Sequence, residues 1–163
     1  MISLIAAMAK NRVIGKDGKM PWHIPSELRQ FRQLTMGKTL LMGRKTFEAI
    51  GGPLKGRKII VLSGSGGGSQ EGDAVTICHS LPQALLLIKQ DEELMVAGGE
   101  SLYRQTVSLA QRIYLTVLDR EYEGDAYFPL FDAKEYRVLS NYMVAGVPER
   151  SLPGYTCLCY ERW

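Results

Sequence analysis

Short apolar runs of strand length alternate along this chain with longer segments of helical periodicity, and this alternation restricts the possible folds most strongly. It is typical of parallel sheets whose crossover connections are helices. Near the end, the turn-rich segment GVPERSLPG separates two further apolar stretches, which is the pattern of a hairpin. We therefore predict a three-layer α/β fold, in which helices flank a mostly parallel sheet with an antiparallel C-terminal strand.

The individual elements follow from the apolar runs and from the cap and turn residues beside them. Strands are expected at 2–9, 39–43, 57–63, 74–79, 93–97, 113–119, 136–144 and 155–162. Helices are expected from an N-cap at Ser26 to about Thr35, over 44–50, over 81–90 after an N-cap at Ser80, and over 100–109. The Gly- and Ser-rich segment 63–69 is interpreted as a mobile surface loop between two strands, because the chain before it is too short for a separate α/β core.

Composition indicates one globular domain that spans residues 1–163, with 45% hydrophobic and 23% charged residues. The formal net charge of +3 suits small anionic ligands, whereas nucleic-acid binding would require a clustered basic stripe that the sequence lacks. The N-terminal run MISLIAAMA is too short for a membrane span or a signal peptide. We expect a cytoplasmic protein without membrane or nucleic-acid partners, and a monomer, since no long exposed apolar strand or heptad seam is evident.

Three cysteines, an odd number without a C-x-x-C pair, argue against both a disulfide framework and a zinc site. Cys157 and Cys159 fall on the same face of a predicted strand, where small buried hydrophobic residues are the simplest interpretation. His23 and His79 lack the spacing of metal ligands, so no metal is expected.

Glu27 is the first residue whose position suggests chemistry. It shares one face of the predicted helix with Phe31 and Leu34, so we expect it to point inward near the helix N-terminus. Desolvation would raise its pKa, while the helix N-terminus would lower it. A carboxyl in an apolar pocket can supply a proton or anchor a polar ring. An exposed first-turn Glu that only favours the helix dipole is the alternative.

Two strand-to-helix junctions have the composition of phosphate sites. At Gly43-Arg44-Lys45-Thr46 two cations meet a helix N-terminus, which suits a phosphate monoester, and at Gly98-Gly99-Glu100-Ser101 glycines let backbone N–H groups approach a diphosphate. Simple turns would explain each junction alone, but together they favour NADP over NAD. The G-x-G-x-x-G fingerprint and its downstream acidic residue are missing, which disfavours a standard Rossmann domain.

A short basic cluster, Lys55, Arg57 and Lys58, precedes a predicted strand. Arg57 could bind a substrate carboxylate through its two-pronged guanidinium group. The cluster could equally be the solvated entrance of a strand.

Four motifs in this sequence resemble bacterial dihydrofolate reductase: IAAMAKNRVIGKDGKMPWHIPSEL, MGRKTFEAIG with the following PLKGRK, VAGGESLY and EGDAYFP. Their order and spacing are close to those of the family, and they cover nearly the full chain. The resemblance implies an eight-stranded sheet with flanking helices and reduction of 7,8-dihydrofolate to tetrahydrofolate by NADPH, for one-carbon metabolism. Antifolate inhibitors are implied as further ligands.

The resemblance also assigns roles to individual residues. Glu27 matches the family's active-site carboxylate, Trp22 the residue that helps order a water near it, and Thr116 the hydroxyl that bonds to it. The implied substrate pocket consists of Ile5, Ala7, Glu27, Leu28, Phe31, Ile50, Leu54, Arg57 and Thr116, with Arg57 on the glutamate carboxylate. The implied cofactor site consists of Ala7, Ile14, Gly43, Arg44, Lys45, Thr46, Leu62, Ser63, Gly98, Gly99, Glu100, Ser101, Leu102 and Tyr103, with Arg44 near the 2′-phosphate and Tyr103 near the nicotinamide. Residues 10–24 correspond to the mobile active-site loop of the family, which Asp125 steadies.

Several positions depart from the family pattern. Ala97 replaces a larger aliphatic residue of the pterin pocket, which implies a roomier pocket and a different affinity for inhibitors. Ile59 replaces an Asn that is common in the family, and Gly52 replaces an Arg. The 63–69 segment replaces a segment that helps hold the adenosine half of the cofactor. None of these departures touches the carboxylate.

Two other functions remain open at this stage. The chain could be a related NADPH reductase of another pteridine or of a pyrimidine ribose intermediate, although Trp22, Glu27 and Arg57 together fit a pterin with a carboxylate tail better. A non-catalytic nucleotide-binding module is the alternative from another class, but it would be expected to lose Glu27 first.

Overall fold

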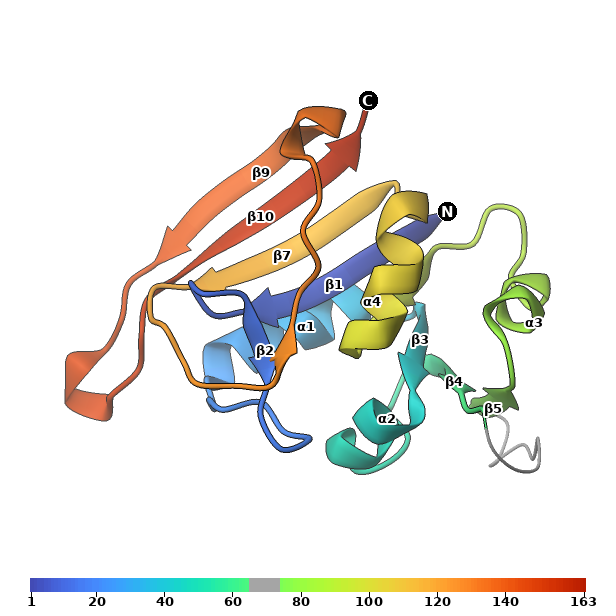
Figure 1. The fold of residues 1–163 in the computed structure, drawn as a ribbon, viewed down its shortest axis with the longest axis horizontal. Coiled ribbons are helices and arrows are strands. Elements are labelled where there is room, and N and C mark those ends of the chain that lie inside the picture. The colour runs from blue at the N-terminus through green and yellow to red at the C-terminus, as the bar shows by residue number, and fades with distance from the viewer. Residues whose placement is uncertain (65–73) are drawn as a thin grey trace.

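The computed structural model describes residues 1–64 and 74–163, so most of the Gly- and Ser-rich segment lies outside the described residues. Eight strands form one sheet in the order β5-β4-β3-β6-β1-β7-β10-β9 (Figure 1). They are β1 (Ile2–Met8), β3 (Thr39–Gly43), β4 (Lys58–Leu62), β5 (Val75–Cys78), β6 (Leu94–Val96), β7 (Arg112–Leu118), β9 (Tyr136–Val144) and β10 (Tyr155–Arg162). Strand β10 pairs antiparallel with β7 and β9, and the remaining pairs are parallel. The predicted sheet is confirmed.

Helices cover both faces of this sheet, as the three-layer prediction requires (Figure 1). They are α1 (Pro25–Thr35), α2 (Arg44–Ile50), α3 (Leu81–Leu86) and α4 (Glu100–Thr106), with short 3-10 turns η1 (Val107–Leu109), η2 (Ala133–Glu135) and η3 (Pro148–Arg150). One buried cluster joins the sheet to α3 and α4, and it contains Ala84 and Leu102. Another lies on the α1 side, where Phe31 and Leu34 pack against it. No helix in the described part of the chain is long and apolar enough to span a membrane.

Three predicted helix boundaries were wrong. Helix α1 begins at Pro25 after Ile24, and Ser26 does not cap it, because its hydroxyl bonds Tyr155 Oη at 2.7 Å. Proline suits the first helical position, where its missing N–H is not needed. Helix α3 ends at Leu86, before the exposed Leu87, and not at 90, although Ser80 does cap its start. Helix α4 ends at Thr106, and 107–109 tighten into η1.

A second, two-stranded sheet was not predicted. Strand β2 (Val13–Gly15) pairs antiparallel with β8 (Ala126–Tyr127) beside the main sheet (Figure 1). Strands of three and two residues are too short to show an alternating pattern. The pair nevertheless matters, because it joins the loop before α1 to the segment after β7.

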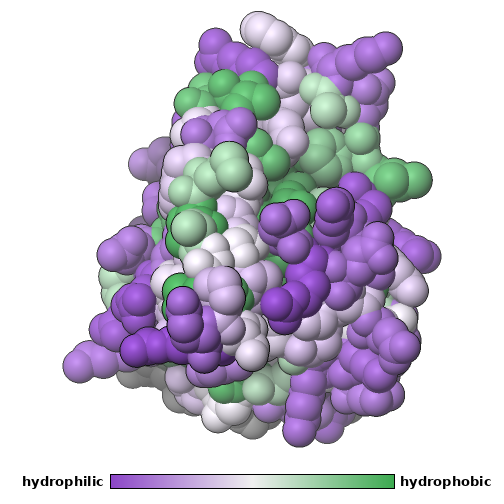
Figure 2. All heavy atoms as spheres, turned by 90° about the vertical axis from the view of Figure 1, so that its left-hand side faces the viewer, coloured by the Kyte–Doolittle hydropathy of each residue, from purple (hydrophilic) through white to green (hydrophobic). Residues whose placement is uncertain are grey.

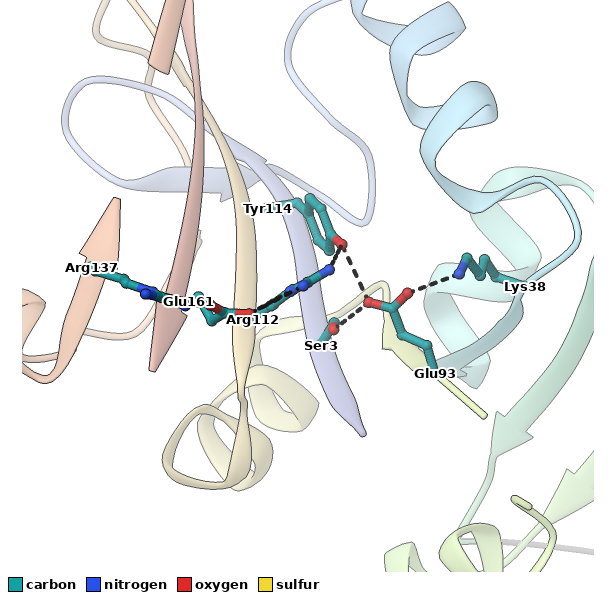
Figure 3. Close-up of polar contacts among 7 residues, drawn as sticks. All are labelled: Ser3, Lys38, Glu93, Arg112, Tyr114, Arg137 and Glu161. Atoms are coloured by element: carbon teal, nitrogen blue, oxygen red, sulfur yellow. Dashed lines mark hydrogen bonds and ion pairs between the residues drawn. The ribbon is translucent and has the colours of Figure 1, made fainter. Parts of the chain in front are cut away.

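A row of polar side chains crosses the end of the sheet at which the parallel strands begin (Figure 3). Its members are Ser3, Lys38, Glu93, Arg112, Tyr114, Arg137 and Glu161. At one end Glu93 accepts from Ser3 at 2.6 Å and pairs with Lys38 at 3.0 Å. In the middle, the Tyr114 hydroxyl donates to Glu93 at 3.3 Å and accepts from Arg112 at 3.4 Å. The row connects strands at this end and leaves the opposite end of the sheet for the site described below.

Strand β9 forms one edge of the sheet and exposes several apolar side chains. Val138 is 54% and Met143 81% exposed, and Leu139 and Tyr142 are about half exposed. Figure 2 faces this side of the molecule and shows apolar groups interspersed with hydrophilic ones. The premise of the monomer prediction, that no long exposed apolar strand exists, is therefore wrong. The β-bulge between β9 and β10 is a feature that hinders pairing of a sheet edge with another chain.

Candidate active site

A cleft of about 2110 Å³ opens at the carboxyl ends of β1, β3 and β6, between the N-terminal ends of α1, α2 and α4. This is where open parallel sheets bind their ligands. Every residue that the sequence placed in the substrate or cofactor site lines this one cleft, namely Ile5, Ala7, Ile14, Trp22, Glu27, Leu28, Phe31, Gly43, Arg44, Lys45, Thr46, Ile50, Leu54, Arg57, Leu62, Ser63, Gly98, Gly99, Glu100, Ser101, Leu102, Tyr103 and Thr116.

Glu27, in the first turn of α1, is the buried acid of the cleft. Glu27 is only 8% exposed, which excludes the alternative of an exposed first-turn Glu that only favours the helix dipole. Burial raises the pKa of this carboxyl to about 7. Desolvation therefore outweighs the helix N-terminus, which alone would lower the pKa. The group can hold or release a proton near neutral pH.

Trp22 and Thr116 lie in the cleft with Glu27. Among the described residues, Trp22 Nε1 is the one buried side-chain polar atom without a hydrogen-bond partner, and it is therefore available to a ligand or a water. Thr116, on β7, is 6% exposed. The structure contains no direct hydrogen bond between Thr116 and Glu27, both of which are described, so the contact that the resemblance implied stays a prediction.

Tyr103 fixes the wall of the cleft between α4 and β1. Its hydroxyl donates to the Ile5 carbonyl at 2.6 Å, and its ring lies 5.0 Å from that of Phe128. Burial, with a smaller effect from the charge of Glu27, raises the pKa of Tyr103, so the hydroxyl stays protonated. Tyr103 thus keeps a rigid surface beside the glycines that begin α4.

The two glycine junctions meet in space, as a dinucleotide site requires. Gly43 N donates to the Gly98 carbonyl at 2.9 Å. Gly98 has φ +119°, a conformation that glycine adopts readily, and an added Cβ would lie 3.5 Å from both Thr46 Oγ1 and Tyr103 Oη. The peptide bond between Gly98 and Gly99 is cis. Without side chains at these positions, a ligand can approach the backbone closely.

Cations mark both outer ends of the cleft. Arg44, on α2, is exposed and pairs with Glu48 at 3.0 Å. At the other end Arg57 is 9% exposed and donates to Thr35 Oγ1 at 3.3 Å, while Lys55 and Lys58 are exposed and do not line the cleft. Of the basic cluster, Arg57 alone therefore faces the site. Burial, together with a neighbouring arginine, lowers its pKa.

The segment between β1 and α1 closes one side of the cleft. Asp17 N donates to Asp125 Oδ2 at 3.0 Å, and Asp125 N donates to the Gly15 carbonyl at 3.0 Å. Asp125 therefore ties this loop to the segment before β8, as the resemblance implied.

Sequence reasoning missed one part of the cleft, which lies beside the inner face of α1. It is lined by Gln30, Tyr114, Ser140, Tyr142, Cys157 and Cys159. These residues come from one helix and three strands, so only the tertiary fold reveals that they are neighbours. The same-face spacing of the two cysteines was the available signal.

Comparison with known proteins decides the family. Residues 1–162 match the sequence model of the family described as dihydrofolate reductase. The chain belongs to the dihydrofolate reductase family. Dihydrofolate reductase type 3 of Salmonella typhimurium is 47% identical over 129 residues, which cover 79% of this chain and 78% of that protein. Dihydrofolate reductase of Bacillus subtilis is 40% identical over 163 residues, which cover 99% of this chain and 95% of that protein.

A solved dihydrofolate reductase has the same architecture. The enzyme from Enterococcus faecalis, complexed with NADP(H) and RAB-propyl, matches with a TM-score of 0.87 and 30% identity, over 99% of this chain and 96% of that chain. The resemblance predicted from sequence motifs is thereby confirmed, as is the fold. The chain is an oxidoreductase of the dihydrofolate reductase family.

Proposed function

We propose that the whole chain acts as a single domain that reduces 7,8-dihydrofolate to 5,6,7,8-tetrahydrofolate with NADPH, in the cytoplasm, for one-carbon metabolism. The observation that carries this proposal is the convergence, in one cleft, of a buried carboxyl, a buried guanidinium and two glycine junctions. Glu27 and Arg57 supply opposite charges for the two ends of a pterin that carries a glutamate tail. Membership in the family supports the same reaction.

Substrate binding follows from the polarity of the cleft wall. The Glu27 carboxyl would accept hydrogen bonds from the amino and ring N–H groups of the pterin, whereas Arg57 would bind a carboxylate of the glutamate tail. The apolar side chains of Ile5, Phe31 and Leu54 line the wall of the same cleft. Leu28 and Ile50 are 37% and 39% exposed. Both side chains are placed to cover the ligand at the mouth of the cleft.

NADPH fits the other half of the cleft. The side-chain-free backbone at Gly43, Gly98 and Gly99 can approach a diphosphate, and Arg44 at the start of α2 can bind a 2′-phosphate. When bound, NADPH supplies a hydride from nicotinamide C4 to pterin C6. Tyr103 and the β1 backbone form the rigid surface against which the two rings would be held face to face.

Protonation of pterin N5 completes the reaction. Glu27 would lie across the pterin ring from N5, so we propose that a water delivers the proton while Glu27 binds and polarises the ring. The buried Trp22 indole N–H has no protein partner among the described residues and would orient such a water. Direct proton donation by Glu27, whose pKa is raised to about 7, is the alternative mechanism.

Two features concern partners of the enzyme. Ala97 lines the cleft, so the pocket has more room for inhibitors than the larger aliphatic residue would leave. Antifolates are therefore proposed as ligands. We also propose a monomer, because the bulge beside β9 opposes edge-to-edge pairing. Size-exclusion chromatography with light scattering would test this state.

A spectrophotometric assay tests the reaction. Purified protein is mixed with dihydrofolate and NADPH, the loss of NADPH absorbance is followed, and NADH serves as the cofactor control. Rapid NADPH-dependent loss is expected, and Glu27→Gln should abolish most of it at neutral pH while NADPH binding persists. Tight NADPH binding without turnover of dihydrofolate would refute the substrate assignment and direct the search to other pteridines or to a pyrimidine ribose intermediate.

A further inference from the structure

Six residues of the cleft have no part in the proposed reaction, and we refer to them as the thiol pocket. They are Gln30 on α1, Tyr114 on β7, Ser140 and Tyr142 on β9, and Cys157 and Cys159 on β10. The pocket is lined by hydroxyl, carboxamide and thiol groups and by no charged group of its own. Such a lining has no evident purpose in binding the anionic substrate or cofactor.

The two thiols of this pocket lie on one face of the same strand. In the ladder between β10 and β7, Cys157 lies opposite Thr116 and Cys159 lies opposite Tyr114. Both partners on β7 line the cleft. Because alternate residues of a strand point to the same side, Cys157 and Cys159 share the face that bounds the cavity.

Neither thiol is used in a structural bond that would remove it from chemistry. Both cysteines are free. The Cys157 thiol, 4% exposed, donates to Gln30 Oε1 at 3.0 Å. Cys159 is half-buried and forms no hydrogen bond with any described residue. Both residues line the cleft, with Cys159 the more accessible of the two and Cys157 packed in a buried apolar cluster.

The spacing of the pair suits a bridging atom better than a disulfide. Residues two apart in a strand are roughly 6.7 Å apart at Cα, which is at the upper limit for a disulfide. An atom that binds both sulfurs and lies between them does not require the short Cα separation of a direct S–S bond. Soft centres of this kind select thiolate ligands.

Burial and neighbouring charges keep the Cys159 thiol in its neutral form. Burial raises the pKa of this thiol most, and the nearby carboxylates of Glu161 and Glu93 raise it further, while Arg112 acts in the opposite direction. Figure 3 shows the Arg112 side chain directed toward the Tyr114 hydroxyl, on the strand next to Cys159. The thiol is thus protonated at neutral pH and slow to attack alkylating agents.

We infer that Cys157 and Cys159 together form a two-thiol binding site for a soft, thiol-seeking centre, for which a trivalent arsenical is the test compound. With phenylarsine oxide, both S–H bonds and the arsenic–oxygen bond break, and two arsenic–sulfur bonds form. The oxygen leaves with the two thiol protons as one water molecule. Arsenic stays trivalent, so no oxidant or reductant takes part.

Binding of an arsenical to the two thiols should affect the substrate half of the active site. Gln30, which holds Cys157, lies one helical turn after Glu27, and Cys157 pairs with Thr116. A bridged thiol pair would hold α1 and β10 in a fixed relation and should raise KM for dihydrofolate at least several-fold, with KM for NADPH unchanged. This consequence rests on the proposed function, whereas binding of the arsenical does not.

Intact-protein mass spectrometry of the folded chain with phenylarsine oxide tests the site. We expect one phenylarsine per chain, formed with loss of one water and removed by 2,3-dimercaptopropanol. Cys157→Ser and Cys159→Ser should each weaken binding by roughly 100-fold or more, because a single thiol loses the chelate advantage. Cys78→Ala is the matched control, since Cys78 does not line the cleft, and its adduct should be unchanged.

Peptide mass mapping of the adduct on the unmutated chain keeps the test independent of how the variants fold. The adduct should map to the peptide that contains both β10 cysteines. No adduct on the folded chain, or an undiminished one in Cys157→Ser/Cys159→Ser, would overturn the proposed site. An adduct that changes neither KM would overturn its link to the substrate pocket. If the chain fails to reduce dihydrofolate, the mass measurement still decides whether the thiol site exists.

Discussion

Replacing Glu27 by Gln should raise the stability of the protein relative to the unmodified chain as the pH increases from 5 to 8. The Glu27 side chain is buried, and burial raises its pKa from 4.5 to about 7. Between these values the folded protein keeps a proton that the unfolded chain has released. Stability is therefore full below pH 4.5 and declines as the pH rises through 7. Gln cannot ionise, so the variant escapes this decline.

The size of the effect follows from the pKa difference. At about 1.4 kcal/mol per pKa unit, the shift corresponds to a loss of roughly 3 kcal/mol in the free energy of unfolding, most of it between pH 5 and pH 8. The difference in free energy of unfolding between Glu27→Gln and the unmodified protein should therefore shift by about 2–3 kcal/mol in favour of the variant from pH 5 to pH 8. The prediction concerns this shift and not the size of the difference at pH 5. This gain accompanies the loss of activity that the same variant should show.

Urea unfolding followed by tryptophan fluorescence, at pH 5, 6, 7 and 8, measures this difference. Glu149→Gln is the matched control, because Glu149 is exposed and forms no ion pair with any described residue. Because its side chain is not buried, Glu149→Gln should not reproduce the gain in stability that Glu27→Gln shows between pH 5 and pH 8. A difference for Glu27→Gln that is independent of pH would refute the view that desolvation dominates at this carboxyl.

Three further variants test other parts of the site. Arg57→Leu should raise KM for dihydrofolate by roughly 10- to 100-fold with a small change in kcat, since a charged hydrogen bond contributes about 1.5–3 kcal/mol. Steady-state kinetics would measure both constants, and an equal effect of replacing the exposed Lys55 by Leu would contradict the role of Arg57. Gly124→Val should slow turnover in kinetics and lower stability by about 1–3 kcal/mol in thermal unfolding, because even a Cβ there meets β2 side-chain and backbone atoms; an unchanged stability would show that this close packing is unimportant. Tyr103→Phe should cost about 1–3 kcal/mol in urea unfolding, because it leaves a buried β1 carbonyl unpaired; an unchanged midpoint would show that this bond is unimportant.

The main sheet was predictable because its strands are apolar runs of the expected length between turn residues. The observed bounds of β3, β9 and β10 equal the predicted ones. The pair of β2 and β8 was not predictable, because its strands have three and two residues and are held by contacts distant in sequence. The start of α1 was misplaced because Ser26 has the composition of a cap, while Pro25 and the tertiary contact with Tyr155 decide the outcome.

The site was predictable only in part from the residues themselves. Helical periodicity indicated that Glu27 faces inward, but it could not decide between desolvation and the helix dipole, which depends on how much of the carboxyl the fold covers. Arg57 could not be separated from its basic neighbours by composition, since only packing buries one of the three. The shared face of Cys157 and Cys159 could be read from the sequence, but the rest of the thiol pocket could not, because Gln30 and Cys157 are joined by a tertiary contact alone.

The most direct test of the central claim is a single-turnover measurement of NADPH oxidation with dihydrofolate, using NADPH that carries deuterium at nicotinamide C4. The account predicts that NADPH oxidation and tetrahydrofolate formation have the same rate, that deuterium slows both, and that Glu27→Gln slows them by roughly 100-fold or more at neutral pH. An unchanged rate in Glu27→Gln, or oxidation of NADPH without formation of tetrahydrofolate, would contradict it.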